Sequence, residues 1–268
     1  MNTNNTYLQT INNHERDTHI TFDEGPHIYT IDGCSNYISV TTWVHSLFRT
    51  FDADRVIDKM MKSRNWPNNK YYGKSKEEIK QEWEDNRDDA ARKGTQLHFE
   101  IETFYNKVEE HDVIPEIDSN AREVTYFKNF YADHVHLAAY RTEWMIYDKE
   151  LRIAGSIDMV FKELDGTLSI YDWKRSKEIV QESRFNEYSI DSVINYIPDT
   201  NYWHYCLQLN VYKALLEKNY GVKISNLFLV RLHPDSEDYE KIRVVNLQEA
   251  VEKLFDARRI QLNEINDS

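Results

Sequence analysis

The sequence has 268 residues, of which 40% are hydrophobic and 13% aromatic, and this is enough apolar material to bury a substantial core. Its formal net charge of −13 argues against a protein that coats nucleic acid indiscriminately, but it is compatible with an enzyme that has a local basic groove. Two cysteines are too few for a disulfide scaffold or a zinc cluster. The sequence has no signal-peptide core and no apolar run of the roughly 20 residues that span a bilayer, so we expect a soluble intracellular protein with no membrane contact.

The N-terminal part of the chain predicts extended structure followed by a helix start. Residues 1–18 are polar and without pattern, which favours a flexible arm. Alternating apolar and polar residues over about 19–31 predict a hairpin, and a further extended piece should reach residue 40. A helix should then begin at Thr41 or Thr42, where free N–H groups and a hydroxyl could bind a phosphate or could simply form an ordinary N-cap.

The next part of the chain is predicted to be mainly helical. Residues 52–92 have a helical composition, with an interruption near 66–69. A Gly-Thr pair at residues 94–95 predicts a short break before the next helix. That helix carries His98 and Glu102 on one face, because they are four residues apart. Taken alone, such a histidine is more often an ordinary surface or core residue than a metal ligand.

The remaining elements predict an α/β or α+β fold with a central mixed sheet flanked by helices. We expect one domain over residues 19–268, with a hairpin and helical part at 19–136 and a catalytic sheet core at 137–268. In chain order, the further elements are a helix at 119–134, a strand at 141–147, an irregular stretch at 178–200, a helix at 202–218, strands at 224–232 and 239–245, and a helix at 247–262.

A strand hairpin formed by residues 155–161 and 168–174 is the most informative stretch. An Asp-Gly pair between its two apolar arms favours a tight turn. Because side chains alternate along a strand, Asp172 and Lys174 share one face, and the tryptophan between them points into a core. Antiparallel pairing would bring Asp158 close to Asp172, where a divalent cation could relieve their repulsion. A surface hairpin with scattered charges is the simpler alternative.

Four short motifs occur in a defined order along the chain: Gly94-Thr95-x-x-His98, Gly155-Ser156-Ile157-Asp158, Asp172-Trp173-Lys174 and Gln208-x-x-x-Tyr212. In this order they resemble the PD-(D/E)XK nuclease superfamily. Within it they are similar to the RecB-like exonucleases, including the Cas-type and mitochondrial genome-maintenance branches. The resemblance implies a restriction-endonuclease-like core with an added N-terminal hairpin and a helical insertion.

The resemblance also implies a metal site. His98, Asp158 and Asp172, with the backbone carbonyl of Trp173, would bind one or two Mg²⁺ or Mn²⁺ ions, and the imidazole would slightly favour Mn²⁺. Lys174 would orient or deprotonate the attacking water and stabilise charge on the phosphate. We expect its pKa to fall, because a nearby cation disfavours the charged ammonium. Asp172 stands where the family usually has the longer Glu.

Further residues are expected to hold the substrate or to support the metal site. Glu102 would support a ligand or bind a second ion, and Glu143 would lie at the sheet edge near the site. The candidates for contacts with the nucleic-acid strand are Gln208, Tyr212, Ser176, Arg175, Thr41, Thr42, Lys93 and, more loosely, Arg92.

The function that these predictions favour is metal-dependent hydrolysis of nucleic acid by a DNA exonuclease acting on single-stranded or frayed ends. An endonuclease of the same superfamily, cutting DNA or RNA, is an alternative. A catalytically silent module that binds nucleic acid or protein is another, although the full set of ligands argues against it. The sequence has no Gly-x-x-x-x-Gly-Lys-Ser/Thr loop, so a helicase or other replication or repair partner would be a separate chain.

Overall fold

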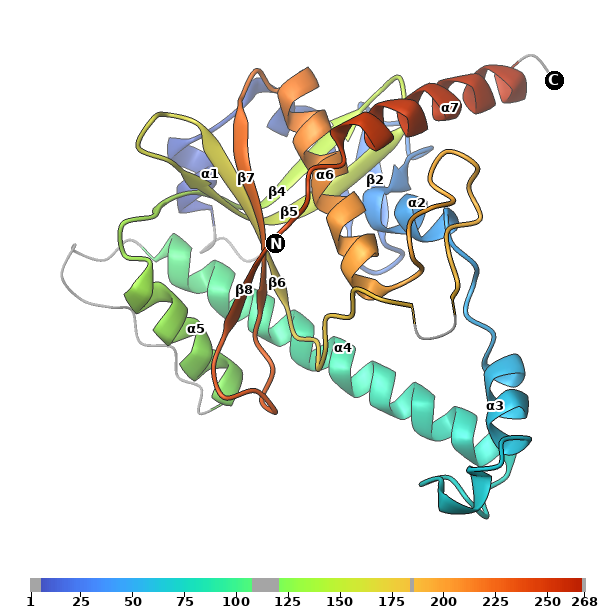
Figure 1. The fold of residues 1–268 in the computed structure, drawn as a ribbon. Coiled ribbons are helices and arrows are strands. Elements are labelled where there is room, and N and C mark those ends of the chain that lie inside the picture. Colours follow the sequence, from blue (N-terminus) through green and yellow to red (C-terminus); the bar gives the residue numbers. More distant parts are fainter. Residues whose placement is uncertain (1–5, 108–120, 184–185, 267–268) are drawn as a thin grey trace.

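A six-stranded mixed sheet forms the centre of the computed structural model, which describes residues 6–107, 121–183 and 186–266 (Figure 1). The predicted α/β fold with a central mixed sheet flanked by helices is confirmed. The strand order is β3-β5-β6-β7-β8, and β4 pairs with β5. The strands are β3 (Ile38–Ser39), β4 (Ala138–Asp148), β5 (Ile153–Lys162), β6 (Leu168–Lys174), β7 (Ile224–Arg231) and β8 (Glu240–Arg243).

Helices cover both faces of this sheet, because the strands β5, β6 and β7 bury apolar side chains on both sides (Figure 1). One core contains Ile157, Ile170 and Leu229 and lies under three helices, α2 (Val40–Ser46), α6 (Asn201–Asn219) and α7 (Gln248–Asn266). The other contains Tyr171 and Trp173 and lies under α4 (Lys76–Asn106) and α5 (Arg122–Asp133). Among the described residues, no helix combines the length and the apolar character needed to cross a membrane.

The predicted hairpin of β5 and β6 is confirmed, and its register opens a gap in the sheet. The two strands are antiparallel, and Met159 lies opposite Tyr171. Both β3 and β6 pair with the edge of β5 that faces away from β4. On that edge, β6 pairs with residues 159–162 and β3 pairs with residues 153–154. Within the described part of the chain, residues 155–157 therefore have a ladder partner only in β4, and the register gives Asp158 none. The end of β6 can diverge from β5 at this point.

The N-terminal segment differs from the predicted flexible arm. Residues 1–5 lie outside the described residues, but the chain then forms α1 (Tyr7–Ile11) and the short 3₁₀ helix η1 (Glu15–His19). Leu8 is buried, and Asp17 makes a 2.8 Å ion pair with Arg141 of β4. The predicted hairpin after it is confirmed as two antiparallel strands, β1 (Ile20–Asp23) and β2 (Ile28–Ile31).

Two helix boundaries differ from the predictions. Helix α2 is capped not by a threonine but by Ser39, whose Oγ accepts a 3.0 Å hydrogen bond from the N–H of Thr42. The break expected at residues 94–95 is absent, since α4 continues through both. Gly94 costs such a helix only about 1 kcal/mol, and burial of Leu97 and Ile101 against the sheet outweighs that cost.

The helical region before α4 agrees with the prediction. It consists of α3 (Ala53–Met61) and the 3₁₀ helix η2 (Trp66–Asn68), and α4 restarts at a capping box formed by Ser75 and Glu78. Figure 1 shows α3 and the first half of α4 extending away from the sheet. A small core of their own joins them, built from Ile57, Tyr71 and Ile79.

The C-terminal half also follows the predicted order of α6, β7, β8 and α7. The predicted start of the helix near residue 119 lies outside the described residues, and α5 begins at Arg122. The irregular stretch before α6 is anchored to the body of the protein, because the Ser189 hydroxyl donates a 2.6 Å hydrogen bond to the carbonyl of Leu47. Ile194 and Ile197 of the same stretch are fully buried.

Candidate active site

A cluster of three possible metal ligands lies at the gap in the sheet. His98 comes from α4, Glu143 from β4 and Asp158 from β5, and one ligand atom of each lies within 4.8 Å of the others. The His98 Nδ1 atom is 3.5 Å from Asp158 Oδ2 and 4.0 Å from Glu143 Oε1. One imidazole and two carboxylates from three separate elements form a site that a divalent cation could occupy.

Glu143 reaches this cluster through an unusual backbone conformation. Its φ angle is 42°, in the left-handed region that non-glycine residues rarely adopt within a strand. The Ser156 hydroxyl then donates a 2.8 Å hydrogen bond to Glu143 Oε2. Burial and the neighbouring Asp158 raise the pKa of Glu143 to about 7. Glu143 was expected only near the site, whereas the structure makes it a member of the cluster.

Asp172 and Lys174 form an ion pair beside the cluster. The Lys174 Nζ atom is 2.7 Å from Asp172 Oδ2, and only 3% of the Asp172 side chain is exposed. Burial raises the pKa of Asp172 to about 6, although Lys174 opposes the shift. Burial alone would lower the pKa of Lys174, but Asp172 and Asp158 outweigh it and raise this pKa above its ordinary value. The protein groups thus act opposite to the lowering expected from the sequence.

Both backbone polar groups of Trp173, its N–H and its carbonyl, contact the cluster and connect it to β6. Its N–H donates a 3.0 Å hydrogen bond to Asp158 Oδ2, and its carbonyl oxygen lies 2.9 Å from His98 Nε2. Burial lowers the pKa of His98, but Asp158 and Glu143 outweigh it and the net shift is upward. The indole of Trp173 points into the core, as predicted from strand alternation.

Tyr205 is a neighbour of Lys174 that the sequence did not single out. The Lys174 Nζ atom lies 4.6 Å from the centre of the Tyr205 ring, a distance typical of a cation–π contact. Tyr205 lies on the same face of α6 as Gln208 and Tyr212, and that shared helix face was the available signal in the sequence. This face packs against the sheet, so Tyr205 comes to lie over the end of β6.

Gln208 and Tyr212 lie beneath the cluster rather than on the surface. Tyr212 is 3% exposed, and its hydroxyl accepts a 3.3 Å hydrogen bond from the Gln208 side chain. Its ring packs on Gly155, where an added Cβ would lie 2.8 Å from Tyr212 Cε1. The glycine of the second motif is thus required for this close approach. Contacts of Gln208 and Tyr212 with nucleic acid remain a prediction.

Three other predicted contact residues lie at helix or strand ends. Thr41 and Thr42 are exposed in the first turn of α2, and β3, directly before them, pairs with the start of β5. The Ser176 hydroxyl donates a 2.8 Å hydrogen bond to the carbonyl of Glu178. Glu102 lies close enough to the cluster to contribute to the raised pKa of Glu143.

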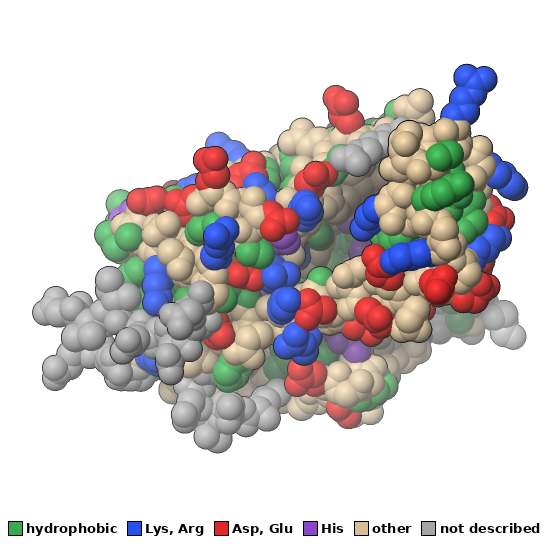
Figure 2. Space-filling view, turned by 90° about the horizontal axis from the view of Figure 1, so that it is seen from below, with side chains coloured by type: hydrophobic (Ala, Val, Ile, Leu, Met, Phe, Trp, Pro, Cys, Tyr) green, Lys and Arg blue, Asp and Glu red, His purple; other side chains and the backbone are tan. Residues whose placement is uncertain are grey.

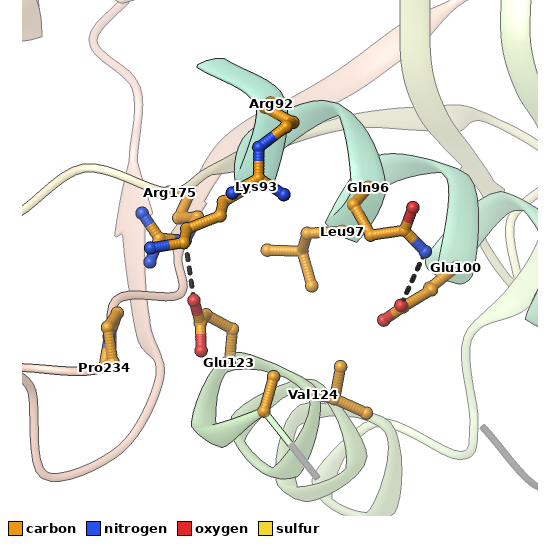
Figure 3. A pocket seen from close by; sticks show the side chains of 10 residues that line it. Arg92, Lys93, Gln96, Leu97, Glu100, Glu123, Val124, Arg175 and Pro234 are labelled. Carbon is orange, nitrogen blue, oxygen red and sulfur yellow. Dashed lines mark hydrogen bonds and ion pairs between the residues drawn. The ribbon is translucent and has the colours of Figure 1, made fainter. Parts of the chain in front are cut away.

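The predicted basic residues are brought together, but in a separate pocket of about 350 Å³ (Figure 3). Arg92, Lys93 and Arg175 gather at one end of it, and each has a carboxylate partner. Arg175 Nε donates a 2.6 Å bond to Glu123. With 3.6 residues per turn, the face of α4 that lines this pocket points away from His98. These residues are therefore not part of the metal-ligand cluster.

The mixed sheet flanked by helices fits the restriction-endonuclease-like core that the sequence motifs predict. The family model of the PD-(D/E)XK nuclease superfamily matches residues 42–267, and the chain belongs to this superfamily. Among curated proteins, none matches the sequence.

Two solved structures show a weak likeness. One is the crystal structure of SSO0001, with 14% identity, a TM-score of 0.35 and coverage of 85% of this chain and 77% of the other. The other is a proposed exonuclease from Eubacterium rectale, with 17% identity, a TM-score of 0.29 and coverage of 47% and 43%, so the match spans less than half of either protein. Both scores are too low to define a shared fold.

Proposed function

We propose that this chain is a metal-dependent nuclease, and specifically a DNA exonuclease that acts on single-stranded or frayed ends. The observation that carries the proposal is the convergence of three possible metal ligands beside the Asp172–Lys174 pair, in a chain of a nuclease superfamily. Hydrolysis of a phosphodiester requires neutralised phosphate charge, an activated water and a stabilised leaving oxygen. The residue types of the cluster suit all three requirements.

The donor set fits a divalent cation. Carboxylates with raised pKa values in partly or fully buried positions lack sufficient positive charge around them, and a cation would supply it. His98, Asp158 and the Trp173 carbonyl would hold it, with Glu143 or Asp172 completing the site. A bound Mg²⁺ or Mn²⁺ would neutralise phosphate charge and lower the pKa of its bound water.

Lys174 is proposed to act as an ammonium. In the protein alone, its carboxylate neighbours favour the charged form by raising its pKa, whereas a bound cation would oppose them. Its N–H groups can orient the attacking water and stabilise negative charge on the phosphate. Asp172 restricts the position of the ammonium through their 2.7 Å contact.

The substrate is proposed to contact the protein locally rather than across a broad basic surface. On the face seen in Figure 2, Lys and Arg side chains are interspersed with Asp and Glu. Such a surface does not favour indiscriminate binding, in agreement with the net charge of −13. Binding should then depend on the metal site and on accessible predicted contact residues such as Ser176, Thr41 and Thr42.

A comparison of three labelled substrates tests this function. A linear DNA strand, a circular DNA strand and an RNA are incubated with Mg²⁺, Mn²⁺ or EDTA, and the products are sized. We expect cleavage of the linear DNA in mononucleotide or short-oligonucleotide steps, with no cleavage in EDTA. Efficient cutting of the circle would instead indicate an endonuclease, and a preference for RNA would reject DNA as the substrate.

The Asp158→Ala variant tests whether the observed cleavage comes from the proposed site or from a contaminating nuclease. Asp158 both belongs to the metal cluster and accepts the Trp173 N–H bond, so the variant should lose cleavage by at least about 100-fold. Circular dichroism checks that it remains folded. Hydrolysis that persists at the wild-type rate would reject the assigned site, and binding without any cleavage by the wild type would favour a silent module.

A further inference from the structure

We propose that Tyr205 is a positioning residue for Lys174, so that its aromatic ring holds the lysine ammonium at the catalytic cluster. This inference rests on the proposed nuclease function. Lys174 has a long flexible side chain that is 18% exposed, and two groups flank its ammonium. The Asp172 carboxylate lies 2.7 Å away, and the centre of the Tyr205 ring lies 4.6 Å away.

The ring differs from the carboxylate in a way that matters for catalysis. Asp172 is also a candidate metal ligand, so its negative charge would be shared between the cation and Lys174. A divalent cation would in addition repel the ammonium. The face of an aromatic ring attracts an ammonium without carrying a full negative charge for which the metal would compete. Tyr205 can therefore keep Lys174 in place where the ion pair alone would weaken.

The position of Tyr205 is itself well defined. It lies in the second turn of α6, on the same face as Gln208 and Tyr212, and α6 packs against the sheet. Burial raises the pKa of the Tyr205 phenol, so the ring stays neutral near physiological pH. The hydroxyl lies near Ser176, the second residue after Lys174, which further ties the ring to the end of β6.

Two substitutions of Tyr205 separate the ring from its hydroxyl. Tyr205→Phe keeps the ring and should retain at least about half of kcat, whereas Tyr205→Leu should lower kcat about 3- to 30-fold. In both variants KM should stay within about twofold, and so should the Kd for the same oligonucleotide, measured by anisotropy with Ca²⁺. Tyr7→Leu, a partly exposed tyrosine of α1, is the matched control and should change none of these values.

A second measurement does not depend on activity. In a thermal double-mutant cycle, Tyr205→Leu should lower Tm less in a Lys174→Met background than in the wild type, because the cation–π contact is already lost. Additive shifts in Tm would contradict the contact.

The kinetic outcomes distinguish this inference from the proposed function. If the wild type cleaves and Tyr205→Leu keeps full kcat, the positioning role is rejected while the nuclease assignment stands. A loss in Tyr205→Phe as large as in Tyr205→Leu would show that the hydroxyl, not the ring, is needed. A rise confined to KM and Kd would indicate that Tyr205 stacks on a nucleobase instead. A wild type that cleaves no substrate would reject both.

Discussion

At the scale of single residues, the cluster brings together carboxylates that would repel each other as isolated charges. Asp158 lies close to His98 and Glu143, and its carboxylate accepts the Trp173 N–H. Burial, together with the nearby charge of Asp158, raises the pKa values of Glu143 and Asp172. The strained φ angle of Glu143 adds a backbone cost of about 1–3 kcal/mol. A site that is costly to fold in the absence of a cation is well suited to bind one.

The contribution of this cluster to the stability of the protein in EDTA should therefore decrease as the pH rises. The folded-state pKa of Asp172 is about 6 against an ordinary value of 3.8, so between about pH 4 and 6 the folded state keeps a proton that the unfolded chain has lost. The stabilisation lost over this window is on the order of 2–3 kcal/mol. The raised pKa values of Glu143 and His98 act in the same direction towards higher pH.

Thermal unfolding at pH 5 and pH 8 measures this effect. Asp172→Asn should reduce the difference in Tm between the two pH values, because its side chain does not titrate. Added Mg²⁺ should raise Tm more at pH 8 than at pH 5, since the carboxylates must be ionised to bind it. Identical pH dependence in the variant and the wild type would show that Asp172 does not carry the shift.

At the scale of elements, glycines at two places in the motifs have different structural roles. In β5, Gly155 lets the Tyr212 ring of α6 pack directly on the strand three residues before Asp158. In α4, Gly94 was expected to break the helix, but the helix passes through it. In the sequence, each glycine is the first residue of a short motif, so the two look alike. Only the packing partner distinguishes a required glycine from a tolerated one.

Substitution of each glycine by alanine should have opposite effects on stability. At Gly155 the new Cβ would lie 2.8 Å from Tyr212 Cε1 and 3.2 Å from Val40 Cγ2, which should cost about 1–3 kcal/mol. At Gly94 the described structure has no atom within 4 Å of the new Cβ, so Gly94→Ala should add about 0.5–1 kcal/mol of helix stability. Urea unfolding checks both, and a neutral Gly155→Ala would contradict the close packing.

At the scale of the whole molecule, the N-terminal segment is part of the folded body. Asp17 bonds to Arg141 and also accepts a 3.1 Å hydrogen bond from the Trp144 indole, and both partners lie in β4. Arg16 extends over the rings of Tyr147 and Tyr220. These contacts tie the start of the chain to the same strand that supplies Glu143.

Loss of the Asp17 carboxylate should therefore destabilise the whole fold. Asp17→Ala leaves Arg141, whose side chain is 3% exposed, without its charged partner, and we expect a loss of about 3 kcal/mol in urea unfolding. Asp88→Ala is the control, because Asp88 pairs with Arg87 in an exposed position and should change stability by less than about 0.5 kcal/mol. Equal effects of the two variants would contradict a buried pair.

The sequence by itself determined the class of fold and most of its elements, because hydrophobic periodicity and turn residues act locally. Motif order also predicted His98, Asp158, Asp172 and Lys174 as site residues, and the structure places these four close together.

Only the tertiary structure decided which further groups lie beside the predicted residues. Glu143 and Tyr205 come from elements far apart in the chain. The fold places Glu143 beside His98 and Asp158, and Tyr205 beside Lys174. The structure also places Arg175 and Lys93 in a pocket that is separate from the metal-ligand cluster. Which side chains of a strand or a helix face one another depends on how distant segments pack. No local sequence pattern encodes that packing.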